Sequence, residues 1–386
     1  MNWLILVFFC ILPFSSIFVH IVDIWHSQGA FFHLGSLCIL SYSLFKLPQK
    51  PMHQTLHIEN KPFGIFVFWL GLTTLFWWNF IIVKEGIYNL PVLMPFVNFL
   101  SFVILYQGIV RYLTIKDLEK MLKCLQYVIG IMVFYAVLQK LNLDQFHKPI
   151  DPALVKIDAI IGTLGNPIHL AGWLSITLPI LYYNTGLFSN ISIILVWLVL
   201  ILTGSASGLM GAIFVTIFYN LFHKIRIKFE GLVFALLAFL GLFTVYKIGF
   251  DKILYFFNPS GRIAFWGKLY EVFREAPITG KGLGILNTLG LNNGLNISVW
   301  RHAHQEYFQI AVETGIIGLV IVLWGIFSYF RLFTKQPKDK LTVCLATIFV
   351  GFLVNCLFNY PAHMWLTGTF GIFAYSGLFV IKGETL

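Results

Sequence analysis

Long apolar stretches separated by short polar segments run through the whole 386-residue chain. A helix that crosses a bilayer needs about 20 mostly apolar residues, so each uncharged stretch near that length, bounded by polar residues or by Gly and Pro, predicts one membrane span. The chain contains twelve such stretches: 2–22, 29–47, 63–83, 90–112, 119–141, 168–184, 189–205, 207–223, 229–247, 315–333, 341–360 and 363–380. Only the sequence GSASG at 204–208 separates the seventh from the eighth, which predicts a tight hairpin or a broken helix there.

The composition excludes a water-soluble globule. Hydrophobic residues make up 58% of the chain and charged residues only 11%, whereas an average soluble domain has about 25% charged residues. Too few polar side chains remain to cover the surface of a soluble chain this long. We therefore predict an all-α, polytopic integral membrane protein with about 12 transmembrane helices. Because no internal repeat divides the chain, we expect residues 1–386 to form one membrane domain.

Lys and Arg predict the orientation of the spans, because they accumulate in cytoplasmic loops. If both termini are cytoplasmic, the loops and the tail on that side hold 15 of the 26 Lys and Arg residues. Of the others, seven lie in the long segment 247–303 and three lie near the segment 141–167. This asymmetry favours an N-in, C-in protein with two long outer loops. Because the bases are dispersed over short connections, the net charge of +10 does not predict a nucleic-acid partner.

The first apolar stretch is expected to remain as a span. No Lys or Arg precedes Lys46, and no small-residue cleavage site follows the stretch, so it does not have the pattern of a removable signal peptide. The five cysteines all lie inside apolar stretches and predict neither a disulfide framework nor a zinc site. His302 and His304 are two residues apart, which would direct them to different faces of a helix, and no HExxH motif is present. We expect no metal and no other cofactor.

Polar residues gather in three segments on the predicted outer side: 162–172, 203–208 and 261–318. In the third, helical spacing predicts an amphipathic helix over 262–274, capped by Ser260 and lying along the outer interface. Its apolar face comprises Phe265, Trp266, Leu269, Val272 and Phe273. From periodicity alone, Arg262 on this helix is more simply explained as an anchor at headgroup level.

Two shorter motifs follow within the same segment. The sequence GKGLG at 280–284, which contains Lys281, is rich in glycine but lacks the preceding strand and the spacing of a nucleotide-binding loop. The sequence RHAHQEY at 301–307 places one Arg, two His and one Glu within six residues. That density exceeds what anchoring at a membrane interface requires.

These motifs resemble the O-antigen ligase and polymerase superfamily of bacterial envelope glycosyltransferases. The resemblance rests on Arg262, Trp266, Pro277 and the GKGLG sequence, followed by HAHQ at 302–305 and ETGIIG at 313–318. His304 and Gln305, nine residues, Gly315, two residues and Gly318 follow the ligase signature. The sequence GNP at 165–167 is also similar to the family pattern. The resemblance covers most of residues 160–320, whereas the first 140 residues match only in hydropathy.

The resemblance implies a GT-C-like fold and an enzyme of the bacterial cytoplasmic membrane. It would transfer a glycan from undecaprenyl diphosphate to an acceptor hydroxyl, such as one on lipid A-core, at the outer face. By the resemblance, His304 is the base that activates the acceptor and Arg262 holds the diphosphate. Further candidates for binding the diphosphate or glycan are Arg301, His302, Asn166, Lys281 and Tyr307. The expected partners are the lipid-linked donor, a lipid or glycan acceptor and membrane lipids.

The sequence departs from the family at one position. The family usually has Ser-Arg-Gly after the seventh span, and this arginine also serves the diphosphate, but here Ala206 stands in the sequence SASG. Arg301 is a candidate replacement from its position alone.

The chemistry agrees with these residue types. A lipid diphosphate is a good leaving group. The reaction therefore needs mainly stabilisation of negative charge and a base for the acceptor hydroxyl. A one-step displacement with inversion is the natural hypothesis. Three alternatives stay open: a polysaccharide polymerase, an oligosaccharyltransferase acting on protein Ser or Thr, and, from another class, a transporter or flippase.

Overall fold

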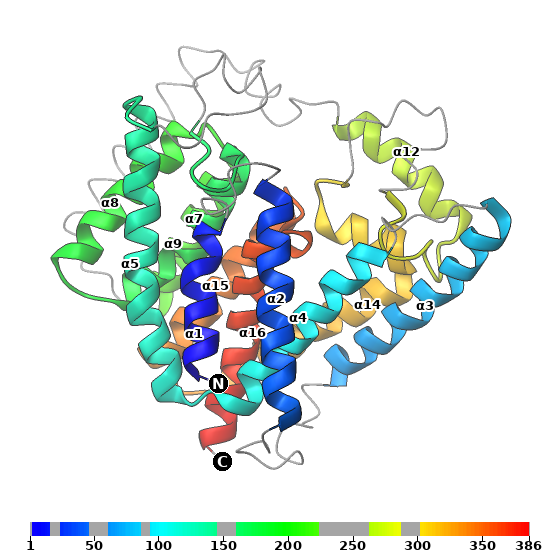
Figure 1. Cartoon of the computed structure of the whole chain (residues 1–386), viewed down its shortest axis with the longest axis horizontal. Helices are drawn as coiled ribbons and strands as arrows, with labels where there is room; N and C mark the ends of the chain where they lie inside the picture. The colour runs from blue at the N-terminus through cyan, green and yellow to red at the C-terminus, as the bar shows by residue number, and fades with distance from the viewer. Residues whose placement is uncertain are drawn as a thin grey trace.

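The computed structural model describes residues 2–15, 24–45, 61–85, 93–144, 160–223, 262–286 and 302–385. Every regular element in these ranges is helical (Figure 1). The α-helices are α1 (Asn2–Ile11), α2 (Ile24–Phe45), α3 (Lys61–Glu85), α4 (Leu93–Tyr112), α5 (Ile115–Lys140), α7 (Pro167–Tyr183), α8 (Leu187–Leu202), α9 (Ala206–Phe222), α12 (Arg262–Glu275), α14 (Glu306–Lys335), α15 (Lys340–Cys356) and α16 (Trp365–Thr385). Two short 3-10 helices are η1 (Leu12–Phe14) and η5 (Pro361–His363).

Eleven of the twelve predicted spans overlap one of these helices. The ninth, 229–247, lies outside the described residues. Within the described ranges, three helices are long and apolar enough to cross a membrane by length and composition: Ile115–Lys140, Glu306–Lys335 and Trp365–Glu384. Several shorter apolar helices accompany them. The all-helical fold is thus confirmed, and the apolar helices are consistent with an integral membrane protein.

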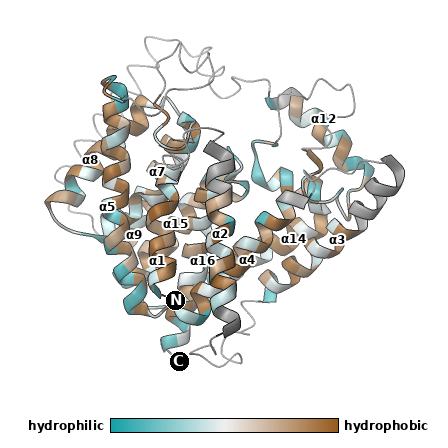
Figure 2. Cartoon of the chain, viewed as in Figure 1, coloured by the Kyte–Doolittle hydropathy of each residue, from teal (hydrophilic) through white to brown (hydrophobic). Residues whose placement is uncertain are grey.

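The outer surface of the helices is strongly apolar. Large hydrophobic side chains such as Phe68, Leu187 and Leu221 are more than two thirds exposed. Most of the helical ribbon in Figure 2 is accordingly hydrophobic, with hydrophilic residues concentrated towards the ends of the helices. Exposed apolar surface of this extent is unfavourable in water and favourable in lipid.

Local capping sets several helix boundaries. The Thr114 side chain accepts a hydrogen bond from the backbone of Asp117, and the Asp117 carboxylate accepts one from the backbone of Thr114, which begins α5 with a capping box. Ser205 caps α9 through the backbone N–H of Gly208. The expected break between the seventh and eighth spans is therefore present as a short turn between α8 and α9.

The helix α7 lies at the centre of the packing. It contacts α5, α8, α9, α15 and α16, and its Trp173 is fully buried. Small residues allow α9 to approach it closely: a Cβ at Gly208 would lie 2.4 Å from that of Ala171. Asn355 of α15 donates to the hydroxyl of Ser175 at 2.9 Å, which adds a polar link within this apolar core.

The helix α12 lies at the opposite end of the molecule from the two termini (Figure 1). The predicted apolar face is confirmed: Phe265, Leu269 and Val272 are buried, and Trp266 and Phe273 pack against the same cluster. That cluster also contains Ala303 and Val312, so the face is buried against the protein's own loop and α14. The expected cap, Ser260, lies outside the described residues.

The helix α14 is broken at Gly315, whose φ of 70° and ψ of −175° are not helical. The break releases three carbonyls that a regular helix would use, and each finds another donor. The carbonyl of Val312 accepts from Lys281 N at 3.0 Å, that of Glu313 from Gly282 N at 2.8 Å, and that of Thr314 from Trp69 Nε1 at 2.9 Å. The segment 277–284 therefore packs on the kink. Because of the kink, the part of α14 before Gly315 does not continue the axis of the predicted span 315–333.

Replacing Gly315 by alanine is expected to lower the free energy of unfolding by about 3 kcal/mol, because only glycine adopts this backbone conformation without strain. The added Cβ would also lie 2.1 Å from the carbonyl oxygen of Ile278. Thermal unfolding in detergent measures the change. Gly325→Ala on the same helix is the control, since its Cβ meets nothing closer than 3.7 Å. Equal unfolding temperatures for the two variants would contradict the role of Gly315.

Candidate active site

Four segments distant in sequence meet around Tyr360, in the connection between α15 and η5. The ring of His302 stacks on the Tyr360 ring with centroids 4.2 Å apart. The ring of His304 packs edge-on against the same ring at 4.8 Å. From the first turn of α7, His169 Nε2 lies 3.2 Å from the Tyr360 hydroxyl. Tyr360 thus holds three histidines in one place.

The expectation that His302 and His304 diverge is wrong, because neither lies in a helix. The helix α14 begins only at Glu306, with Gln305 as its N-cap. His304 has a φ of 53°, a left-handed conformation that is uncommon outside glycine. This turn of the chain allows both imidazoles to face Tyr360.

Arg262, the first residue of α12, reaches the same place. Its Nη1 donates to the carbonyl of Phe358 at 3.1 Å. Its Nε is buried and has no hydrogen-bond partner among the described residues. Burial lowers the pKa of Arg262, but an arginine remains a cation at any physiological pH. The site therefore contains a fixed positive charge with unused hydrogen-bonding capacity, which suits an anionic ligand.

Two titratable groups that the charge of Arg262 acts on, His304 and Tyr360, are neutral. Burial, and secondly the charge of Arg262, lower the pKa of His304 to about 4. Burial raises the pKa of Tyr360 to about 12, although Arg262 opposes the shift. Near neutral pH the site thus combines a cationic guanidinium with an unprotonated imidazole that can accept a proton.

A second polar cluster, largely buried, lies behind these residues. Glu306, Gln309 and Glu313 follow one face of the first part of α14, and each is only 1% exposed. His363 of η5 lies between the two carboxylates: its Nδ1 is 2.6 Å from Glu306 Oε1 and its Nε2 is 3.4 Å from Glu313 Oε2. Burial alone would lower the pKa of His363, but the two carboxylates outweigh it and raise that pKa well above its ordinary value.

The carboxylates of this cluster also hold the neighbouring loops. Glu306 Oε2 accepts from the backbone N–H of Ala362 at 3.0 Å. Glu313 Oε1 accepts from the backbone N–H of Gly284 at 3.2 Å. Trp266 of α12 donates to the carbonyl of Ala303 at 2.8 Å. The segment that carries His302 and His304 is therefore fixed to α12 as well as to α14.

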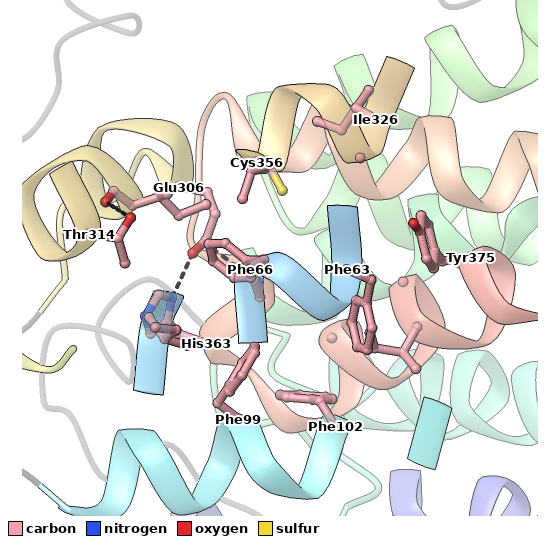
Figure 3. A pocket seen from close by; sticks show the side chains of 18 of the residues that line it. Phe63, Phe66, Phe99, Phe102, Glu306, Thr314, Ile326, Cys356, His363 and Tyr375 are labelled. Atoms are coloured by element: carbon pink, nitrogen blue, oxygen red, sulfur yellow. Dashed lines mark hydrogen bonds and ion pairs between the residues drawn. The ribbon is translucent and has the colours of Figure 1, made fainter. Parts of the chain in front are cut away.

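An apolar cavity of about 250 Å³ adjoins the cluster. Its walls come from α3, α4, α14, α15 and α16, and Figure 3 shows the aromatic rings of Phe63, Phe66, Phe99 and Phe102 around it. Glu306 and His363 lie at its polar end, joined by their hydrogen bond. The charged cluster thus separates an apolar space from the histidines around Tyr360.

The structure brings together Arg262, His302 and His304, but not all of the other predicted site residues. Asn166 caps α7, with its Oδ1 accepting from Ile168 N at 2.8 Å. Tyr307 lines the cavity, and its hydroxyl donates to the carbonyl of Leu353 at 3.3 Å. Lys281 forms an ion pair with Glu275 of α12 and is not among the side chains around Tyr360. Arg301 lies outside the described residues.

The segment 203–208, which lacks the family arginine, does reach the site. The hydroxyl of Ser207 accepts from Asn359 Nδ2 at 3.0 Å, and Asn359 precedes Tyr360 in the chain. Ala206 is therefore one residue from a direct contact with the loop that carries Tyr360.

Sequence reasoning missed His169, Gln309, Tyr360 and His363. A signal for the last two was present: the sequence NYPAH at 359–363 interrupts the last two apolar stretches with four residues that are polar or proline. The apolar pattern extends the last two predicted spans into this sequence, whereas the structure ends α15 at Cys356 and begins α16 at Trp365. Among the described residues, no group of three or more His, Cys, Asp and Glu side chains is arranged to hold a metal ion.

The comparison with protein families adds an independent observation. Residues 191–323 match the O-antigen ligase family model. The matched segment includes Arg262, His302, His304 and the first part of α14, whereas His169, Tyr360 and His363 lie outside it. Members of the family are membrane glycosyltransferases, either ligases or polymerases. The comparison with curated proteins found no match.

Proposed function

We propose that this protein transfers a glycan from undecaprenyl diphosphate to an acceptor hydroxyl at the outer face of the bacterial cytoplasmic membrane. The observation that carries the proposal is the meeting of Arg262 and His304 at Tyr360, within an O-antigen ligase domain. A cation for the diphosphate and a neutral base for the acceptor then lie side by side. The protein would span the membrane about twelve times, with both termini in the cytoplasm.

The proposed reaction is a single displacement. The acceptor oxygen attacks the anomeric carbon of the first sugar, and the bond from that carbon to the diphosphate oxygen breaks. The electron pair leaves with the diphosphate, where the Arg262 guanidinium stabilises the added charge. The acceptor proton passes to the His304 imidazole, which is neutral before the step because its pKa is about 4. No metal takes part in this scheme.

The roles of the remaining candidate residues rest on the family resemblance. We assign His302, Asn166, Lys281, Tyr307 and Arg301 to binding of the diphosphate or glycan, with His302 closest to His304 through the shared contact with Tyr360. Arg301 is the candidate to replace the family arginine that is absent at Ala206. The acceptor distinguishes a ligase from a polymerase or a protein oligosaccharyltransferase, and a ligase acting on lipid A-core is our preferred assignment.

Reconstitution in proteoliposomes tests the proposal. The purified protein is supplied with undecaprenyl diphosphate-linked glycan and, separately, with lipid A-core, a growing polysaccharide or a Ser- and Thr-containing protein. We expect transfer to one of these acceptors, without added metal, and a new glycosidic bond whose anomeric configuration is inverted relative to the donor. Retention of configuration would exclude the one-step mechanism. Absence of transfer to every acceptor, with movement of the donor across the bilayer instead, would favour a flippase.

A further inference from the structure

The buried cluster behind the histidines contains one imidazole, two carboxylates and one amide, and their hydrogen bonds can be counted. Gln309 Oε1 accepts from the backbone N–H of Ala303 at 3.0 Å. Its Nε2 therefore has two hydrogens to donate and three neighbours: His302 Nδ1 at 3.3 Å, His363 Nε2 at 3.1 Å and Glu313 Oε1 at 3.2 Å. The protonation state of His363 decides which two of these neighbours receive them.

If His363 is an imidazolium, both of its nitrogens donate, to Glu306 and to Glu313. Gln309 then gives its two hydrogens to Glu313 and to His302 Nδ1, and every polar atom of the cluster is satisfied. If His363 is neutral, the shorter contact, with Glu306, keeps its proton on Nδ1. The bare Nε2 then faces Glu313 and takes one hydrogen from Gln309. Gln309 then has one hydrogen left for two acceptors, Glu313 and His302. The charged Glu313 holds it more strongly than neutral His302 does, so His302 Nδ1 loses its hydrogen bond.

From this count we propose that His363 is a positioning residue for glycan transfer: as an imidazolium between Glu306 and Glu313, it commits Gln309 to His302 and so fixes the tautomer of His302. In that tautomer Nδ1 accepts from Gln309 and Nε2 carries the proton. His302 is then a neutral imidazole, and its ring is held flat against Tyr360, on which His304 also rests. This inference rests on the proposed function for the reaction that is positioned.

The surroundings of His363 favour the charged form. Facing it from α14 are Glu306 and Glu313, and from the segment before that helix His302, whose ring centroid is 5.4 Å away. The other titratable groups beside this cluster are Tyr360 in the preceding loop and Tyr307 and Cys356 on the cavity side. The only formal charges among these neighbours are the two carboxylates. Raising the pH through the pKa of His363 leaves the two carboxylates without a cation and turns Gln309 from His302 to His363.

The direct test is nitrogen NMR of histidine side chains in the full-length protein, labelled with ¹⁵N-histidine in detergent or nanodiscs. His302→Asn and His363→Asn assign the two signals. At pH 7 we expect both nitrogens of His363 to be protonated, and His302 to be protonated at Nε2 only. As the pH rises and His363 loses its proton, the His302 signals should change in parallel. Glu313→Gln removes one carboxylate and should move both changes to lower pH, whereas the exposed Glu271→Gln should move neither.

Transfer kinetics complete the test. For His363→Asn we expect kcat to fall on the order of tenfold to a hundredfold, because a misplaced His302 no longer meets the charge that develops on the diphosphate in the transition state. KM for the donor should change less, because the other binding residues still hold the ground state. The alkaline limb of kcat should follow the NMR titration of His363 in both wild type and Glu313→Gln. If His363→Asn does not fold, the histidine signal whose titration moves in Glu313→Gln identifies His363. The titrations of wild type and Glu313→Gln then still show whether His302 follows His363.

Two results would overturn the inference: a neutral His363 at pH 7, or a His302 tautomer that stays the same while His363 titrates. A wild-type protein that shows the coupled titration but transfers no glycan would instead refute the proposed function, because the NMR signals do not depend on transfer.

Discussion

Replacing His304 by asparagine is expected to lower the rate of glycan transfer by about 100- to 10,000-fold, the usual contribution of a general base. Asparagine cannot take the acceptor proton at neutral pH. It does tolerate the left-handed backbone that His304 adopts at a φ of 53°, so the loss should reflect chemistry and not folding. The measurement is initial rate in proteoliposomes at equal amounts of folded protein.

The matched control is His223→Asn, at the end of α9, where the imidazole packs on Tyr219. It should keep the wild-type rate. His304→Ala serves as a second variant: it removes the same base but adds backbone strain, so its unfolding temperature should be lower than that of His304→Asn. Transfer by His304→Asn at the wild-type rate would show that His304 is not the base and that the assignment of the reaction is wrong.

The helices of this fold are largely predictable from the sequence. An apolar stretch in a membrane must satisfy its backbone hydrogen bonds internally, and a helix does so within one segment. The starting point of α14 is not predictable in this way. Residues 306–314 contain Glu306, Gln309 and Glu313 and do not resemble a span, so the span was expected to begin at 315. The structure starts the helix at Glu306 and breaks it at Gly315, because the docked segment 277–284 satisfies the carbonyls that the break releases.

The site was predictable only where its residues are close in sequence. Arg262 and His304 belong to motifs in one segment, 261–318, and the structure brings them together. Tyr360 and His363 follow more than 50 residues later, beyond two further apolar helices, and only the packing of α14 against α15 and α16 brings them to the histidines. The polar interruption at 359–363 indicates a loop, but it gives no sign that His363 lies between two buried carboxylates.

Replacing Arg262 by glutamine is expected to lower kcat/KM by about 100- to 1,000-fold, because the diphosphate loses the cation that stabilises its developing charge. A second effect should appear in the pH profile. In wild type His304 is unprotonated above its pKa of about 4, so kcat/KM falls on the acidic side only near that pH. Arg262 contributes to lowering this pKa. Its removal should therefore move the acidic limb to higher pH, while burial keeps the limb below the ordinary histidine value.

Arg262→Lys separates the two effects. Lysine keeps the positive charge beside His304 but loses the planar fork that binds two phosphate oxygens at once. The acidic limb should then stay near pH 4, while kcat/KM still falls by about tenfold. Arg274→Gln, on the exposed side of the same helix, is the control and should change neither quantity. An acidic limb that moves equally in Arg262→Lys and Arg262→Gln would mean that packing by the guanidinium, and not its charge, sets the pKa of His304.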